Sequence, residues 1–132
     1  MLEYPTIKQI SEYNIMAIND ALDAPQKPTL RKGDVDGFRV DMTDYLRSTE
    51  TISSVTSVTV TGVSTGAITV ASAAASTGAL TILGQSVGAG QAITFNVTVA
   101  STATVGTYEA TIKAVTSDSR TGHRRVAFTV VG

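Results

Sequence analysis

The chain has 132 residues, 42% of them hydrophobic, which is enough for one folded domain of about 100 residues and an appendage. The formal net charge of -1 gives no broad field that would attract nucleic acid or an anionic membrane. The absence of cysteine excludes disulfides and thiolate metal sites, and no run approaches the roughly 20 apolar residues of a membrane span.

The first predicted element is an α-helix over residues 6–22. Its apolar residues follow helical spacing, and Thr6 with Gln9 matches a capping box at its start. The apolar surface is too wide for one small domain to cover, so we expect this helical arm to dock on a partner protein. Packing across the chain's own sandwich is the alternative. The residues expected to contact the partner are Ile7, Ile10, Tyr13, Ile15, Ile18 and Leu22.

A linker is expected after the helix, where Pro25 and Pro28 deny helix continuation and favour an extended path. Charge also changes along the chain: nine of the eleven acidic residues lie before residue 51, and only Glu109 and Asp118 lie after it. We therefore divide the chain into an arm and linker over residues 1–33 and a domain over residues 34–132.

The second part has the short alternating apolar runs and glycine-containing turns of an all-β domain. We interpret the stretch 71–76 as a loop or edge crossing and the stretch 84–90 as a flexible connection, and residues 117–122 supply the turn of a hairpin. The seven predicted strands are Phe38–Met42, Val58–Thr61, Ala67–Ala71, Ala79–Leu83, Ile93–Val99, Tyr108–Ala114 and Val126–Val130.

Seven short strands with turn signals at intervals of roughly 8 to 12 residues favour an immunoglobulin-like β-sandwich, although periodicity alone does not exclude a small jelly roll. The expected fold class is therefore mainly β, a sandwich of about seven strands behind an N-terminal α-helical arm. Valine, isoleucine and alanine must fill its core, because aromatic residues make up only 5% of the chain and there is no tryptophan.

Residues that could support catalysis or ligand binding are sparse. The single histidine, His123, stands among arginines, which makes it a poor general base, and Asp118 is interpreted as a turn residue. The run Asp34-Val35-Asp36-Gly37 fails the EF-hand pattern, which leaves a different calcium site at Asp34, Asp36, Asp41 or Asp44 as a minor alternative to solvated turn carboxylates. We expect no catalytic residues, metal or cofactor.

Two stretches resemble known proteins. Residues 106–120, GTYEATIKAVTSDSR, are similar to the late hairpin of bacterial and phage immunoglobulin-like modules, in which Gly-x-Tyr opens a strand that ends in a Ser-Asp-Gly-Arg type of turn; Ser119 stands where that turn has glycine. Tyr108 would either form a tyrosine corner or simply fill the core. Residues 38–46, FRVDMTDYL, followed by Thr51-Ile52, resemble the opening of the phage fibre-tail adaptor proteins, with Met42 where an aromatic residue is usual.

The resemblance covers roughly residues 34 to 131 and implies a structural protein of a bacteriophage virion, assembled in the host cytoplasm. Its partners would be other virion proteins of the tail, portal adaptor, fibre or capsid, and a homo-oligomer is expected in the assembly. The leading hypothesis is a tail adaptor that links tail components or fibres through the arm. The alternatives are a capsid decoration protein and, from another class, a carbohydrate-binding or adhesive module.

Overall fold

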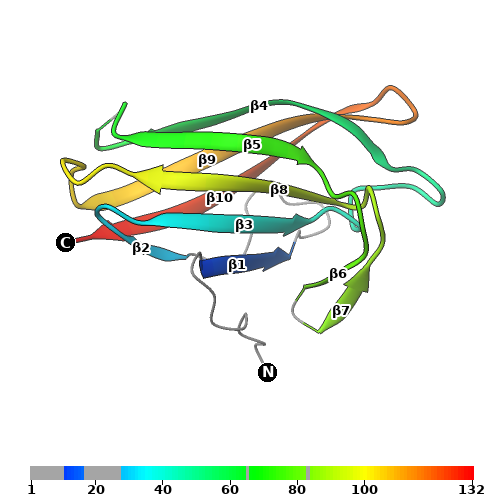
Figure 1. Cartoon of the computed structure of the whole chain (residues 1–132). Coiled ribbons are helices and arrows are strands. Elements are labelled where there is room, and N and C mark those ends of the chain that lie inside the picture. The colour runs from blue at the N-terminus through cyan, green and yellow to red at the C-terminus, as the bar shows by residue number, and fades with distance from the viewer. Residues whose placement is uncertain (1–10, 17–27, 65, 83) are drawn as a thin grey trace.

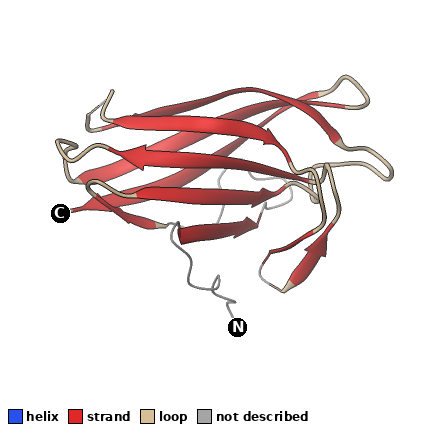
Figure 2. Cartoon of the chain, in the orientation of Figure 1, coloured by secondary structure: helices blue, strands red, loops and turns tan. Residues whose placement is uncertain are grey.

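The computed structural model describes residues 11–16, 28–64, 66–82 and 84–132, and within these ranges it is mainly β and contains no helix (Figure 2). No described helix, therefore, is long and apolar enough to cross a membrane. The strands are β1 Ser11–Met16, β2 Thr29–Arg31, β3 Val35–Asp41, β4 Ile52–Gly62, β5 Ile68–Ala75, β6 Leu80–Ile82, β7 Gln85–Val87, β8 Ala92–Val99, β9 Gly106–Thr116 and β10 Thr121–Val131.

Two four-stranded sheets pack face to face (Figure 1). The first has the strand order β1-β3-β8-β5 and the second has the order β2-β10-β9-β4. The short β6–β7 hairpin forms a separate two-stranded sheet at one end of the molecule. Each of the seven segments predicted from the sequence overlaps one of these strands.

The core between the sheets follows from alternation along the strands. In β8, β9 and β10 every second side chain is buried, and these side chains point toward the opposite sheet. Four aromatic rings lie at the centre: Phe38 packs on Phe95 and Phe128, with ring centroids 5.2 and 5.9 Å away, and Tyr108 stacks on Phe128 at 5.7 Å. Aliphatic residues and alanines complete this core, as the composition requires.

The N-terminal helix predicted over residues 6–22 is wrong for residues 11–16, which form strand β1. This strand pairs in parallel with β3, in a register that places Ser11 opposite Asp36 and Met16 opposite Asp41. Pairing with β3 gives the backbone amides and carbonyls of this segment hydrogen-bond partners. These bonds outweigh the weak helical preference of its sequence. The remaining residues of the predicted helix lie outside the described part of the chain.

Strand β2 lies in the predicted linker and is extended, as its prolines favour. It pairs in parallel with the end of β10, and the Pro28 carbonyl accepts a hydrogen bond from the Thr129 amide at 2.9 Å. The side chain of Leu30 is 1% exposed and belongs to the main core. Residues 29–31 are therefore part of the folded sandwich.

Two connecting segments differ from the sequence-based interpretation. The stretch 71–76, expected to be a loop or edge crossing, mostly continues strand β5, with a bulge between Ala71 and Ala74 at which Ser72 has a φ of 59°. The stretch 84–90, expected to be a flexible connection, contains strand β7, which pairs in antiparallel orientation with β6. Small side chains hide strand signals because they lack apolar alternation. The predicted hairpin at residues 117–122 is confirmed between β9 and β10.

Candidate functional site

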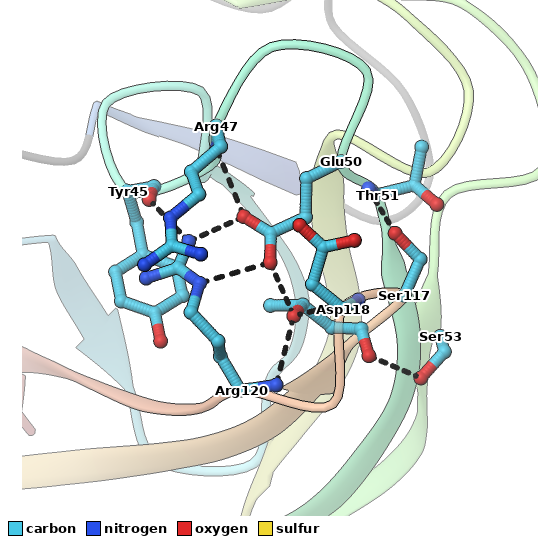
Figure 3. A network of polar contacts seen from close by, with 9 residues as sticks. Tyr45, Arg47, Glu50, Thr51, Ser53, Ser117, Asp118 and Arg120 are labelled. Atoms are coloured by element: carbon cyan, nitrogen blue, oxygen red, sulfur yellow. Dashed lines mark hydrogen bonds and ion pairs between the residues drawn. The ribbon is translucent and has the colours of Figure 1, made fainter.

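The most extensive polar network in the described residues joins two loops at one end of the sandwich (Figure 3). One loop connects β3 to β4, and the other is the turn between β9 and β10. We call the network the loop lock and define it by Tyr45, Glu50, Thr116 and Arg120. Glu50 and Arg120 are 70 positions apart in the sequence, so the lock ties distant segments together.

Glu50 is the centre of the loop lock, and it is 1% exposed. Its carboxylate forms an ion pair with the guanidinium of Arg120, which donates through Nη2 and, at 2.9 Å, through Nε. The backbone amide of Arg47 and the hydroxyl of Thr116 also donate to it. The hydrogen bond from Arg120 is the main reason that the pKa of Glu50 is lowered to about 2, so the carboxylate is ionised at neutral pH.

Tyr45 lies against the opposite side of Arg120. The guanidinium carbon lies 4.5 Å from the centroid of the Tyr45 ring, which is a cation–π contact, and Nη2 also donates to the Tyr45 carbonyl at 3.1 Å. The ring covers Gly122 so closely that a Cβ at this position would overlap it. Only glycine at position 122 therefore leaves room for the Tyr45 ring.

Arg124 is 4% exposed. Burial lowers the pKa of its guanidinium, and the nearby Asp44 and Tyr45 partly offset this lowering.

The loop lock holds two exposed loop tips in fixed positions. Arg47, Ser48 and Thr49 are exposed immediately before buried Glu50, and Thr49 has a φ of 66°. In the facing turn, residues 117–119 are exposed and Ser119 has a φ of 63°. Non-glycine residues in this region of backbone space cost roughly 1 kcal/mol or more and persist where surrounding contacts fix them. The two tips therefore form a rigid polar surface that could contact another protein.

A second feature stabilises the loop at the other end of the sandwich. The hydroxyl of Tyr108 donates to the carbonyl of Thr104, four residues upstream, at 2.7 Å, and the ring is buried in the core. This is the geometry of a tyrosine corner, which settles the two possibilities that the sequence left open.

The outer face of the first sheet carries a shallow cavity of about 350 Å³. Its floor comes from β3 and β8, with Arg39, Thr94 and Asn96 among its polar residues, and Leu80 of the β6–β7 hairpin forms part of its wall. The Arg39 guanidinium donates to the Thr81 carbonyl at 3.0 Å and thereby holds the hairpin against the sheet. The aromatic residues in its lining, Phe38 and Phe95, have side chains at most 2% exposed, so this cavity presents no aromatic platform to a sugar.

The residues weighed from the sequence for catalysis or metal binding are dispersed. His123 is exposed on β10 opposite Lys113, and Asp118 lies in the preceding turn. Asp41 accepts hydrogen bonds from the amide and hydroxyl of Thr43, at 2.9 and 2.7 Å, and so caps its own turn. Within the described ranges no group of three or more histidine, cysteine, aspartate or glutamate side chains is placed to hold a metal ion.

The buried position of Asp36 was not expected from the sequence. It is 5% exposed, and burial, assisted by the charge of Asp34, raises its pKa to about 6. Alternation with Phe38 and Val40 places it on the inner face of β3, a signal that the sequence contained.

Most of the residues predicted to bind a partner through the arm lie outside the residues that the structure describes. Tyr13 and Ile15 belong to β1, whereas Ile7, Ile10, Ile18 and Leu22 lie outside the described residues. The loop lock, in contrast, was missed. Its sequence signal was Glu50, which ends the charged first part of the chain, together with Arg120, which ends the turn pattern of residues 117–120, but nothing in the sequence alone pairs them.

No protein-family model matches the sequence, and no curated protein sequence matches it. Two solved structures are similar in their chain path. A family 123 glycoside hydrolase from Clostridium perfringens, analysed for the hydrolysis of glycolipid glycans, has a TM-score of 0.42 and 10% identity over 81% of this chain. The solution structure of amebosin has a TM-score of 0.37 and 12% identity, and the match covers 88% of this chain and 97% of amebosin. This chain spans 23% of the hydrolase, and we draw no function from either similarity.

Proposed function

We propose that the chain is a non-catalytic structural protein of a bacteriophage virion, a tail adaptor with an immunoglobulin-like fold that connects tail components or fibres. The observation that carries the proposal is the loop lock, because it joins the two sequence stretches that resemble phage proteins. Tyr45 belongs to the first stretch, whereas Thr116 and Arg120 belong to the second. A motif pair that builds one rigid surface suits a protein that presents loops to neighbouring subunits.

Strand pairing supports the immunoglobulin-like part of this proposal. Taking β3, β4, β5, β8, β9 and β10 as strands B to G, the pairings are B–E and E–D in one sheet and G–F and F–C in the other. The parallel pairing of β2 with β10 fits a first strand that switches to the second sheet. The tyrosine corner falls at the start of β9, the position of strand F, where immunoglobulin-like domains carry it.

The chemistry of the loop lock supports a structural role over a catalytic one. Glu50 is held by Arg120, Thr116 and the Arg47 amide, so its oxygens are occupied by the fold. Removing one member of a buried ion pair is strongly destabilising, which ties the shape of both loop tips to the stability of the domain. Such coupling is useful where a loop must keep its shape when a partner binds.

The N-terminal segment is the second part of the proposed adaptor. Because β1 pairs with β3 and β2 pairs with β10, the segment is attached to both sheets of the sandwich. We propose that the residues flanking β1 contact a neighbouring virion protein. Capsid decoration is the alternative within the same setting, and a carbohydrate-binding module receives no support from Phe38, Phe95, Tyr108 and Phe128, which line the core, or from Tyr45, which belongs to the loop lock.

The test is localisation in purified particles. A chain with a C-terminal tag is produced in cells that assemble the virion, and the particles are labelled with gold and imaged by negative stain. Labels at the tail or at the junction of head and tail are expected. Labels over the whole head would replace the adaptor with a decoration protein, and particles without label or without the chain would overturn the virion assignment.

A deletion tests the proposed attachment through the N-terminal residues. Removing residues 1–10 retains β1 and β2, and we expect a folded domain that is no longer incorporated into particles. The control is the full-length variant Lys113→Ala, which changes an exposed residue of β9 and should be incorporated normally. Incorporation of the shortened chain at the wild-type level would show that these residues do not carry the attachment.

A further inference from the structure

Among the described residues, one side of the sandwich is formed by two strands that each have a single neighbour in their sheet. Strand β4 pairs with β9, and β5 pairs with β8, and neither strand pairs with the other. They are consecutive in the chain and run along the same side of the molecule (Figure 1). On the opposite side, the terminal strands are the short segments β1 and β2.

The β4–β5 side lacks the usual protection of an open sheet edge. Natural edges are blunted by charged side chains, especially lysine, and by proline, because unpaired backbone groups recruit strands from other molecules. No charged residue stands between Glu50 and Glu109, and no proline follows Pro28. Both edge strands fall inside this uncharged stretch, whereas β1 contains Glu12 and β2 contains Arg31.

The core is also less completely covered on this side. The inward-facing side chains of β9 and β10 are fully buried, but those of β4 and β5, apart from Ile52 at the start of β4, are only partly buried where they pack against the same core. An additional strand beside either edge would remove more of this apolar surface from water. The partly buried side chains concerned are Val55, Val58, Val60, Ile68, Val70, Ala73 and Ala75.

The two edges differ in regularity. In β5 the bulge between Ala71 and Ala74, with Ser72 in the left-handed region, interrupts the edge near its middle. In β4 both irregularities lie before Val58, and the first residue is held by a bond of 2.7 Å from the Ile52 amide to the Gly90 carbonyl. The segment Val58–Gly62 keeps a continuous register with β9. It is the longest regular stretch of open edge on this side.

We propose that Val58–Gly62 pairs in antiparallel orientation with the same segment of a second copy of this chain. An antiparallel strand pair has its own two-fold axis, so one edge is complementary to itself. With the axis at Val60, Thr59 faces Thr61 of the second copy, and both threonines are exposed in the monomer. Paired threonines are favourable cross-strand neighbours, and the absence of charge removes repulsion across the axis. The pairing joins two four-stranded sheets into one of eight strands.

The first test uses the full chain without substitution. Sedimentation equilibrium from about 1 µM to about 1 mM should show a monomer–dimer equilibrium with a dissociation constant on the order of 10–100 µM, because the interface is small. Amide hydrogen exchange measured across the same range should slow as concentration rises at Val58, Val60 and Gly62, whose amides alternate with those bonded to β9 and point toward the open edge. This result does not depend on where the protein acts, so the dimer and the virion assignment can fail separately.

The second test is the double variant Thr59→Lys/Thr61→Lys, which places like charges opposite each other across the axis. We expect the dissociation constant to rise at least about tenfold while circular dichroism stays unchanged. The matched control is Thr98→Lys/Thr121→Lys, which adds the same two charges at exposed positions away from β4 and should dimerise like the wild type.

Three outcomes would overturn the proposal. The first is a chain that stays monomeric throughout the concentration range. The second is a dimer whose concentration-dependent protection lies on β5 or elsewhere, outside β4. The third is a monomer in which the amides of Val58, Val60 and Gly62 are already protected at the lowest concentration, which would mean that another part of the same chain covers the edge.

Discussion

Replacing Tyr108 with phenylalanine removes one hydroxyl from the tyrosine corner and keeps the ring in the core. The ring is 1% exposed and stacks on Phe128, and these contacts are retained. The lost interaction is the 2.7 Å hydrogen bond to the carbonyl of Thr104. Because Thr104 is an exposed residue, water can reach that carbonyl in the variant, and the full cost of a buried unpaired acceptor does not apply.

The expected loss is therefore the net value of one hydrogen bond, about 1 kcal/mol in the free energy of unfolding. For a domain of this size the same change lowers the melting temperature by roughly 3–6 °C. Urea unfolding followed by circular dichroism should show a lower midpoint with an unchanged slope, since the surface exposed on unfolding is the same.

The matched control is Tyr45→Phe, which removes a tyrosine hydroxyl from the loop lock but keeps the ring beside Arg120. We expect a smaller change in stability than for Tyr108→Phe. A wild-type midpoint in the Tyr108 variant would refute the contribution assigned to the corner. A loss above about 3 kcal/mol would show that the ring repacks, because a single net hydrogen bond cannot supply that much.

Three further predictions concern charge and backbone. Glu50→Gln should make the stability of the domain less sensitive to acid. The pKa of Glu50 is lowered to about 2, so its ionised form contributes stability that is present above pH 4.5 and is lost as pH falls toward 2. Urea unfolding midpoints of the wild type and the variant, compared at pH 6 and pH 2.5, will measure the difference. Asp36→Asn should have the opposite signature, because its raised pKa of about 6 weakens the wild-type fold as pH rises from 4 to 7, so the variant gains over the wild type at pH 7 and not at pH 4. Ser119→Gly should stabilise the hairpin by about 0.5–1 kcal/mol, because glycine adopts a φ of 63° without strain. Ser117→Gly should destabilise the hairpin, because it removes the hydroxyl that accepts a hydrogen bond from the Thr51 amide. Thermal unfolding that ranks the two variants the other way would contradict this account.

The sequence was informative where alternation of apolar residues is strong. Residues 93–99 alternate over their whole length, and they form the central strand β8. Strand β5 was harder to recognise beyond Ala71, because alanine and serine differ little in hydrophobicity and a bulge breaks the period of two. Strand β1 was predicted as a helix, since isoleucines at positions 7, 10 and 18 fit a helical period and only the open edge of β3 determines the pairing of residues 11–16.

The candidate site was only partly accessible from the sequence. Tyr108 was identified as a possible tyrosine corner because its place after Gly106 at a strand start has a known physical role, and the bond to Thr104 confirms it. The partnership of Glu50 with Arg120 could not be predicted, because it depends on which loops the strand order brings to the same end of the sandwich. A single chain contains no covarying positions that would have revealed this contact.

The separation of Glu50 and Arg120 has a consequence for synthesis. On the ribosome, the carboxylate emerges 70 residues before its guanidinium partner, and β2 must wait still longer for the end of β10. In that interval the uncharged strands β4 and β5 are outside the ribosome without the central strand β9. Nascent chains with unpaired strand edges aggregate readily, so the yield of this protein should depend on translation rate and on chaperones that shield the strands until the hairpin closes.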